Sequence, residues 1–278
     1  MQTPASAALP TPGQRLARLR ETVPLVHNIT NYVAMNTMAN VLLAMGASPA
    51  MIHAREEAAA FVPVAAALTI NIGTLSREWL AAMVEAAVAA SAAGRPWVLD
   101  PVAAGVSSFR LAAAQRLLSL RPTVLRGNAS EIIALGMHGG ATGRGVDAAD
   151  GVAAAAAVAR ELAVTYGSVV AVTGPVDLLT DGVRCVRVAN GHALMPQVTA
   201  LGCALTGVVA AFLGSDPDPA ADALATATAA LACYGVAGER AGAVADGPGS
   251  FAVAFLDALH GLAPAEVDAE VRIEWVDC

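Results

Sequence analysis

Short apolar runs alternate with longer helical segments along almost the whole chain, and this alternation limits the possible folds more than any other feature. Residues 66–73 (AALTINIG) and 96–101 (PWVLDP) are two such runs, each followed by a helical pattern. Strands that are continuously apolar are typical of parallel sheets buried on both faces. We therefore predict an α/β fold in one domain, residues 13–278, with a mostly parallel central sheet flanked by helices on both faces. Residues 1–12 are predicted to form a flexible N-terminal tail.

The second half of the chain departs from the simple alternation. A hairpin is predicted across Asp181 and Gly182, and after further helices residues 269–276 (AEVRIEWV) are expected to form a last strand. A glycine-rich link, residues 138–145, precedes a helix predicted from about Asp150 to Tyr166. The first strand is not followed by G-x-G-x-x-G, and no G-x-x-x-x-G-K-[ST] occurs. These absences argue against a dinucleotide-binding dehydrogenase and a Walker-type ATPase.

Charge and hydropathy exclude two further classes of protein. The net charge is −7 and basic clusters are lacking, which argues against nucleic-acid binding. Residues 193–215 carry no charge and could span a bilayer by length, but Pro196 and Gly202 divide the run. We expect a buried helix there, and no membrane association.

The cysteines and the N-terminus indicate the compartment. The four cysteines form neither a C-x-x-C pair nor a spacing that suits zinc, and a large apolar core needs no disulfide framework. The first residues lack the basic and apolar regions of a signal peptide. We expect a cytoplasmic protein, with Cys185, Cys233 and Cys278 as a hairpin, a core and a tail thiol.

Polar residues follow or end most of the predicted strands. The carboxyl ends of parallel strands lie along one edge of a sheet, where ligands of α/β proteins bind. The alternative interpretation of each residue alone is a helix N-cap. The set comprises Asn28, Thr30, Asn71, Asp100, Asn128 and Thr173.

Two acids lie among these strand ends. Asp100 follows a buried strand, and Glu131 lies near the start of the next helix. Two carboxylates suit Mg²⁺, which uses few protein oxygens and keeps water and phosphate as its other ligands. For Glu131 the alternative is an acid that stabilises a helix N-terminus. Arg126 could pair with either acid or bind a phosphate.

The segment "ALGCALTG" brings Gly202 and Cys203 to the start of a long apolar helix. Free N–H groups at such a start bind anions and can stabilise a transferring phosphoryl group. At this position we expect a lowered pKa for Cys203, which could serve as a base or as a nucleophile. No motif identifies a histidine partner for a nucleophilic Cys203.

Several segments, in this order and at this spacing, resemble the hydroxyethylthiazole kinase family from about residue 15 to residue 262. They are "LVHNITNYVAMNTMANVLLAMGASPAM", "LTINIGTL", "VLDPVAAGVSSFR", "LRGNASEI", "VTGPVD", "GCALT" and "DGPGSF". The resemblance implies a ribokinase-like fold and a homotrimer with sites between subunits. It also implies ATP- and Mg²⁺-dependent phosphorylation of the hydroxyl of hydroxyethyl-methylthiazole in thiamine salvage.

Matching motif positions imply a role for each candidate residue. Asn31, Met51 and Ala200 would bind the thiazole, and Arg126, Asn128 and Thr173 would contact ATP. Asp100 and Glu131 would hold Mg²⁺, and Gly202 and Cys203 would form the anion hole, with Cys203 in the position of a general base.

One residue departs from the family pattern, and other activities stay open. Relatives often have glycine where this chain has Ala200, which would be strained if that position required a positive φ. A kinase of the same fold could act instead on a pyridoxine or hydroxymethylpyrimidine alcohol. A Cys203-dependent hydrolase and a thiazole-binding protein without catalysis are the alternatives from other classes.

Overall fold

The computed structural model describes residues 9–136 and 148–278, and their strands form one sheet in the order β2-β1-β3-β4-β5-β6-β7-β8-β9. The first six strands of this order are parallel, and β7, β8 and β9 extend the sheet in antiparallel fashion. The strands are β1 Leu25–Ile29, β2 Ser48–Ala50, β3 Ala67–Asn71, β4 Trp97–Asp100, β5 Val124–Asn128, β6 Val169–Thr173, β7 Asp177–Thr180, β8 Cys185–Val188 and β9 Ile273–Val276. The prediction of a mostly parallel central sheet is confirmed.

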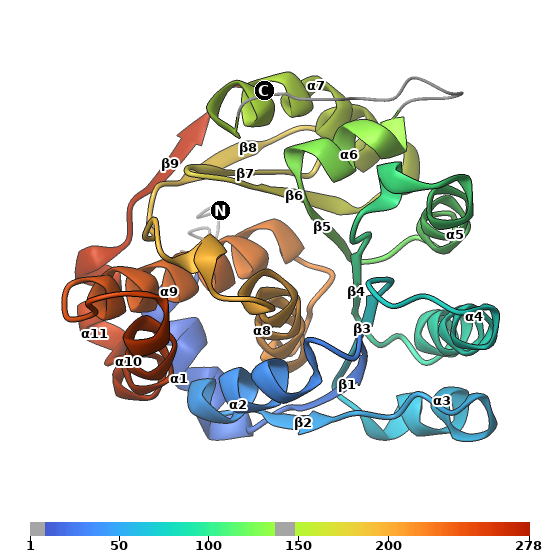
Figure 1. Cartoon of the computed structure of the whole chain (residues 1–278), viewed down its shortest axis with the longest axis horizontal. Helices are drawn as coiled ribbons and strands as arrows, with labels where there is room; N and C mark the ends of the chain where they lie inside the picture. The colour runs from blue at the N-terminus through green and yellow to red at the C-terminus, as the bar shows by residue number, and fades with distance from the viewer. Residues whose placement is uncertain (1–8, 137–147) are drawn as a thin grey trace, which may run out of the picture.

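Helices cover both faces of the sheet, as predicted. Figure 1 shows α3, α4 and α5 beside one face and α2, α8 and α9 on the other side. The helices are α1 Pro12–Thr22, α2 Met35–Met45, α3 Arg55–Phe61, α4 Arg77–Ala92, α5 Ser108–Leu118, α6 Ala129–Gly136, α7 Ala148–Tyr166, α8 Leu201–Ser215, α9 Ala223–Gly242, α10 Pro248–Gly261 and α11 Pro264–Glu270. Each face has its own apolar core, because alternate residues of the buried strands point to opposite sides.

Local signals in the sequence set several helix boundaries. Ser76 caps α4 by accepting a hydrogen bond from the N–H of Trp79 at 3.1 Å. Gly46 ends α2 with a φ of 104°, which glycine adopts without strain. Thr11 caps α1, so helix begins at the end of the predicted tail. Residues 1–8 of that tail and the glycine-rich link lie outside the described residues.

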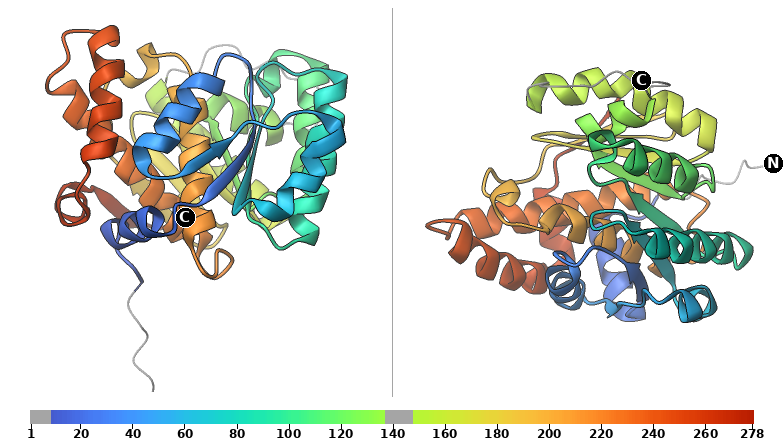
Figure 2. Two further views of the ribbon diagram at one scale, coloured as in Figure 1. Left: turned by 90° about the horizontal axis from the view of Figure 1, so that it is seen from below. Right: turned by 45° about the vertical axis from the view of Figure 1, so that its right-hand side comes forward.

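The register of the parallel strands brings the predicted strand ends together. Asn71 is the Cα partner of Asp100, and Asn128 is the partner of Thr173. All four are the last residues of their strands. Asn28 lies within β1 and Thr30 directly after it. In the views of Figure 2 the N-terminal half of the chain supplies most of this parallel part, and the later segments add the hairpin and the helices that cover one face of the sheet.

The prediction that all four cysteines are free thiols is wrong for Cys185 and Cys278. Cys185 and Cys278 form a disulfide across 93 residues of sequence. Strand β9 pairs with β8 so that Val276 lies opposite Cys185, and two further residues bring Cys278 next to it. This pairing between distant segments left no spacing signal in the sequence. Cys233 is a buried free thiol, as predicted.

The uncharged run ends in a helix buried inside the protein. Helix α8 packs against β1, β3 and β4, and nearly all of its residues are buried. Within residues 9–136 and 148–278, no helix is long and apolar enough to cross a membrane.

Candidate active site

The candidate site lies where the carboxyl ends of β3–β6 meet the start of α8. A 3₁₀ turn, Met195–Gln197, leads the chain to Ala200, the N-cap of α8. Ala200 has φ 67° and ψ −2°, in the left-handed region. The position therefore does require a positive φ, and the alanine there is strained.

The start of α8 can bind an anion. Its first helical hydrogen bond runs from the N–H of Ala204 to the carbonyl of Ala200 at 2.8 Å, so the N–H groups of the three residues between them precede the helical ladder. A Cβ added to Gly202 would lie 3.3 Å from Nη2 of Arg126. The absence of a side chain at Gly202 thus lets a guanidinium lie against the helix start, where both favour negative charge.

Arg126 is held by two residues from neighbouring strand ends. Its Nη2 donates to Oγ1 of Thr173 at 2.7 Å, and its Nη1 lies 3.5 Å from Oδ2 of Asp100. Burial by itself lowers the pKa of Arg126, but the negative charges of Asp100 and Glu131 outweigh it and raise that pKa. The guanidinium is therefore a fixed positive charge at the end of the sheet.

Asp100 is fully buried, and its two oxygens differ. Its Oδ2 accepts hydrogen bonds from Asn71 at 2.8 Å and Thr206 at 2.9 Å, in addition to the contact with Arg126. Its Oδ1 is buried without a hydrogen-bond partner in the described part of the chain. Burial raises the pKa of Asp100, and the charge of Arg126 opposes that rise.

The free oxygen of Asp100 fits the predicted Mg²⁺. This ion is often held by one or two carboxylates together with the phosphates of a substrate. The described residues contain no group of three or more His, Cys, Asp or Glu side chains that could hold a metal ion. Asp100 by itself offers one oxygen that is free of hydrogen bonds from these residues.

Glu131 and Asn128 form a cap at the start of α6. Oδ1 of Asn128 accepts from the N–H of Glu131 at 3.0 Å, and Oε2 of Glu131 accepts from the N–H of Asn128 at 2.9 Å. The other oxygen of Glu131 accepts from the N–H of Ala103 at 2.9 Å. Both residues have the capping role that the sequence offered as an alternative. Their contacts with metal and ATP stay predictions.

Asn31 and Cys203 lie together and are connected to Asp100 through Asn71. Nδ2 of Asn31 donates to Sγ of Cys203 at 3.4 Å and to Oδ1 of Asn71 at 2.9 Å. Burial, followed by the charge of Asp100, raises the pKa of the Cys203 thiol. The expectation of a lowered pKa is wrong, because burial outweighs the hydrogen bonds from Asn31 and Asn71 and the nearby guanidinium of Arg126.

Direct contacts join Arg126 to Asp100, Thr173 and the backbone position of Gly202, and join Asn31 to Cys203. Asn128 and Glu131 bond to each other, and Asn128 pairs with Thr173 in the sheet. Met51 follows β2 and packs, half-buried, against the core on the α8 side.

Three residues near these contacts were not predicted as site residues. Asn71 was noted only as a strand end, and Thr206 follows Cys203 by three residues, which places both on one side of α8. Asp177 follows the Thr173 turn, and burial raises its pKa to about 7.

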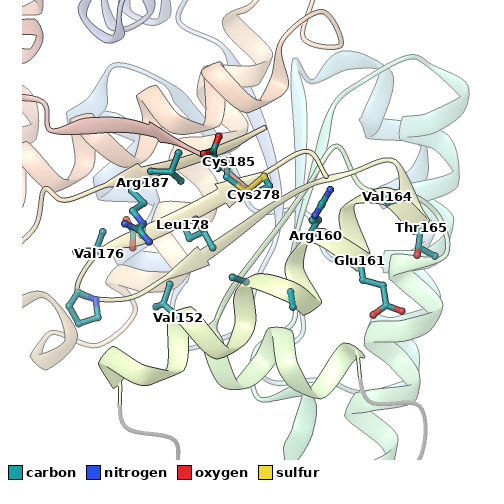
Figure 3. Close-up of a pocket in the computed structure, with 16 residues that line it drawn as sticks. Val152, Arg160, Glu161, Val164, Thr165, Val176, Leu178, Cys185, Arg187 and Cys278 are labelled. Atoms are coloured by element: carbon teal, nitrogen blue, oxygen red, sulfur yellow. A yellow bond between two sulfur atoms is a disulfide. The ribbon is translucent and has the colours of Figure 1, made fainter. Parts of the chain in front are cut away.

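A groove lies between α7 and the antiparallel part of the sheet. It encloses about 930 Å³ and is lined by residues that include Arg160, Arg187 and the Cys185–Cys278 disulfide, as Figure 3 shows. None of the ten predicted site residues lines it. Asp177, which interacts electrostatically with Arg126, does line it, so the groove borders the candidate site at this residue.

Comparison with known proteins identifies the family. The model of the hydroxyethylthiazole kinase family matches residues 16–265. A hydroxyethylthiazole kinase of Cereibacter sphaeroides is 59% identical over 263 residues, which cover 94% of this chain and 98% of that protein. The solved structure of a hydroxyethylthiazole kinase protein from Pyrococcus horikoshii has a TM-score of 0.86 at 39% identity, covering 96% of this chain and 99% of that one.

A more distant structure shows the fold class. A ribokinase-like superfamily protein from Enterococcus faecalis superposes with a TM-score of 0.59 at 13% identity, covering 93% of this chain and 90% of that one. The fold is therefore ribokinase-like, as expected. With its family model matched over most of its length, the chain belongs to the hydroxyethylthiazole kinase family.

Proposed function

We propose that the protein transfers the γ-phosphoryl group of ATP to the hydroxyl of hydroxyethyl-methylthiazole, which yields the thiazole phosphate used in thiamine salvage. Family membership and the curated relatives support this reaction. The single observation that carries it is the contact between two halves of the site, one suited to phosphate and one to the alcohol. The start of α8 with Arg126 favours phosphate, and Asn31 beside Cys203 lies directly next to it.

The phosphate half of the site is proposed to stabilise charge. In phosphoryl transfer, catalysis comes mostly from positioning and from neutralising the negative charge of the transferring group. The N–H groups at Gly202 and Cys203 and the guanidinium of Arg126 are suited to this role. Thr173 orients that guanidinium and contacts the nucleotide. Asn128, exposed at the end of β5, is proposed to contact ATP with its remaining amide group.

The alcohol half of the site is proposed to orient the attacking hydroxyl. Asn31, Met51 and the main chain of Ala200 would line the thiazole pocket. Because the pKa of Cys203 is raised, the residue is a neutral thiol near pH 7. Its sulfur accepts a hydrogen bond from Asn31, which leaves the S–H free to point elsewhere. We infer that Cys203 orients the hydroxyl and that strong basicity is not required of it.

Asp100 is proposed to hold Mg²⁺ through Oδ1, with Glu131 reaching it only if a capping bond is released. Bound there, Mg²⁺ would neutralise charge on the phosphates of ATP.

We also propose a cytoplasmic homotrimer with sites between subunits, as the resemblance implies. Sedimentation equilibrium would test the trimer, and a monomer with full activity would contradict it.

The test is an ADP-release assay with ATP and Mg²⁺. Hydroxyethyl-methylthiazole, pyridoxine and hydroxymethylpyrimidine are compared, and each product is identified by mass spectrometry. We expect turnover with the thiazole and at most slow turnover with the other two. A preference for pyridoxine or hydroxymethylpyrimidine would show that this alcohol, and not the thiazole, is the substrate. No ADP release with any of the three would refute the kinase assignment.

A further inference from the structure

The two half-sites are joined by a chain of buried hydrogen bonds, and Asn71 lies at its centre. The Oδ1 of Asn71 accepts from Asn31 at 2.9 Å and from the N–H of Gly73 at 2.9 Å. Its Nδ2 donates to Oδ2 of Asp100 at 2.8 Å. Asn71 is fully buried, so water cannot replace these partners without a rearrangement.

The direction of each hydrogen bond in this chain is fixed by main-chain donors. The N–H of Gly73 can only donate, so the atom of Asn71 that faces it must be the oxygen, and its amino group must face Asp100. The N–H of Ala34 donates to Oδ1 of Asn31 at 3.0 Å, which turns the amino group of Asn31 toward Asn71 and Cys203. The orientation of both amides therefore follows from the backbone.

Thr206 adds a second donor to the same oxygen of Asp100. Its hydroxyl lies 2.9 Å from Oδ2, and the side chain is fully buried on α8, one turn after Cys203. Together with Arg126, three donors approach Oδ2. No described residue donates to Oδ1. The carboxylate is thus fixed in rotation, with one oxygen fully used and the other free.

We propose that Asn71 and Thr206 are positioning residues of the kinase: they hold Oδ2 of Asp100 so that Oδ1 faces the metal and phosphates, and Asn71 also orients Asn31 toward Cys203. This inference rests on the proposed reaction. Thr206 acts on the metal half-site only, whereas Asn71 acts on both halves. Partners that orient a metal ligand contribute about 10- to 100-fold to metal affinity or activity in other proteins.

The first variant to make is Thr206→Val, which keeps the shape of the side chain and removes the hydroxyl donor. Thr206→Ser restores the donor. Thr69→Val is the matched control, because Thr69 is also fully buried and donates at 2.9 Å to Asn28, outside the Asp100 contacts. Binding of Mn²⁺ in the presence of ADP, measured by electron paramagnetic resonance, reports metal affinity without turnover.

We expect Thr206→Val to weaken Mn²⁺ binding by about 10- to 100-fold and to raise the Mg²⁺ concentration needed for half-maximal ADP release by a similar factor. The KM for the thiazole should change by less than about threefold, since the hydroxyl of Thr206 donates to Asp100 and not to Asn31 or Cys203. Thr206→Ser should recover most of the metal affinity, and Thr69→Val should bind Mn²⁺ as the wild type does.

Asn71→Ala should show both effects. We expect the weaker Mn²⁺ binding of Thr206→Val together with a KM for the thiazole raised about tenfold, because Asn31 loses the acceptor that orients it. Asn31→Ala should change the thiazole KM alone. This pattern distinguishes a positioning role from a general loss of structure, which thermal melting of each variant monitors.

Two results would overturn the inference. One is Mn²⁺ binding by Thr206→Val within about twofold of the wild type. The other is an equal loss in Thr206→Val and Thr69→Val. If the wild-type enzyme binds Mn²⁺ with ADP but phosphorylates no alcohol, then the proposed function fails. In that case the Mn²⁺ affinities of the variants still test whether Thr206 and Asn71 position Asp100.

Discussion

Replacing Ala200 with glycine should make the protein more stable, although glycine is not as favourable at a helix N-cap as a residue whose side chain caps the helix. Ala200 is the N-cap of α8 at φ 67°, where the methyl group is strained. Holding an L-residue in the left-handed region costs about 1–2 kcal/mol. Glycine removes this strain and loses about 0.5–1 kcal/mol more conformational entropy on folding. The net gain expected for Ala200→Gly is therefore about 0.5–1 kcal/mol.

The assay is thermal unfolding followed by circular dichroism, at one protein concentration and scan rate. For a chain of this length, that gain corresponds to a rise in Tm of about 1–3 °C. The control is Ala112→Gly in α5, an exposed helical position where glycine should lower the free energy of unfolding by about 1 kcal/mol. The same substitution should thus act in opposite directions at the two positions.

The outcome that refutes this reasoning is a lower Tm for Ala200→Gly, or the same decrease as for Ala112→Gly. It would mean that the turn into α8 does not hold Ala200 at a positive φ. ADP release by Ala200→Gly should stay within about threefold of the wild type, because glycine keeps the main chain of the helix start in place.

Three further predictions concern residues at or near the site. Burial raises the pKa of Cys203, so its alkylation by iodoacetamide, located by mass spectrometry, should still accelerate with pH above pH 9; a plateau near pH 7 would show a thiolate instead. We expect Cys203→Ala to keep partial activity and Cys203→Asp to stay active, and a phosphorylated Cys203 in the native enzyme would contradict this. Gly202→Ala places a methyl group about 3.3 Å from the guanidinium of Arg126, so we expect a KM for ATP raised at least tenfold, with a Tm close to that of the wild type; an unchanged KM would place the nucleotide elsewhere. Cys278→Ser should lower the free energy of unfolding by about 2 kcal/mol, because the bond to Cys185 holds only an edge strand, and should leave ADP release unchanged; a loss of activity would link that edge to the site.

The sequence by itself determined the layers of the fold and the edge of the sheet that carries the site. Buried parallel strands need continuous apolar runs, and the helices between them need caps and terminators, so both leave local patterns. Asp100 and Thr173 could be placed at strand ends along one edge of the sheet for this reason. Gly202 could be placed at a helix start because small residues precede a long apolar segment.

Only the tertiary structure decided how these residues act on one another. The φ of Ala200 depends on how the chain enters α8, and the pKa of Cys203 depends on burial that no local pattern records. The hydrogen bonds of Asn71 and Thr206 to Asp100 join residues 29 and 106 positions apart in sequence. The disulfide likewise follows from the pairing of β8 with β9. Such contacts form between segments that meet only after folding, and a single sequence contains no local pattern that indicates them.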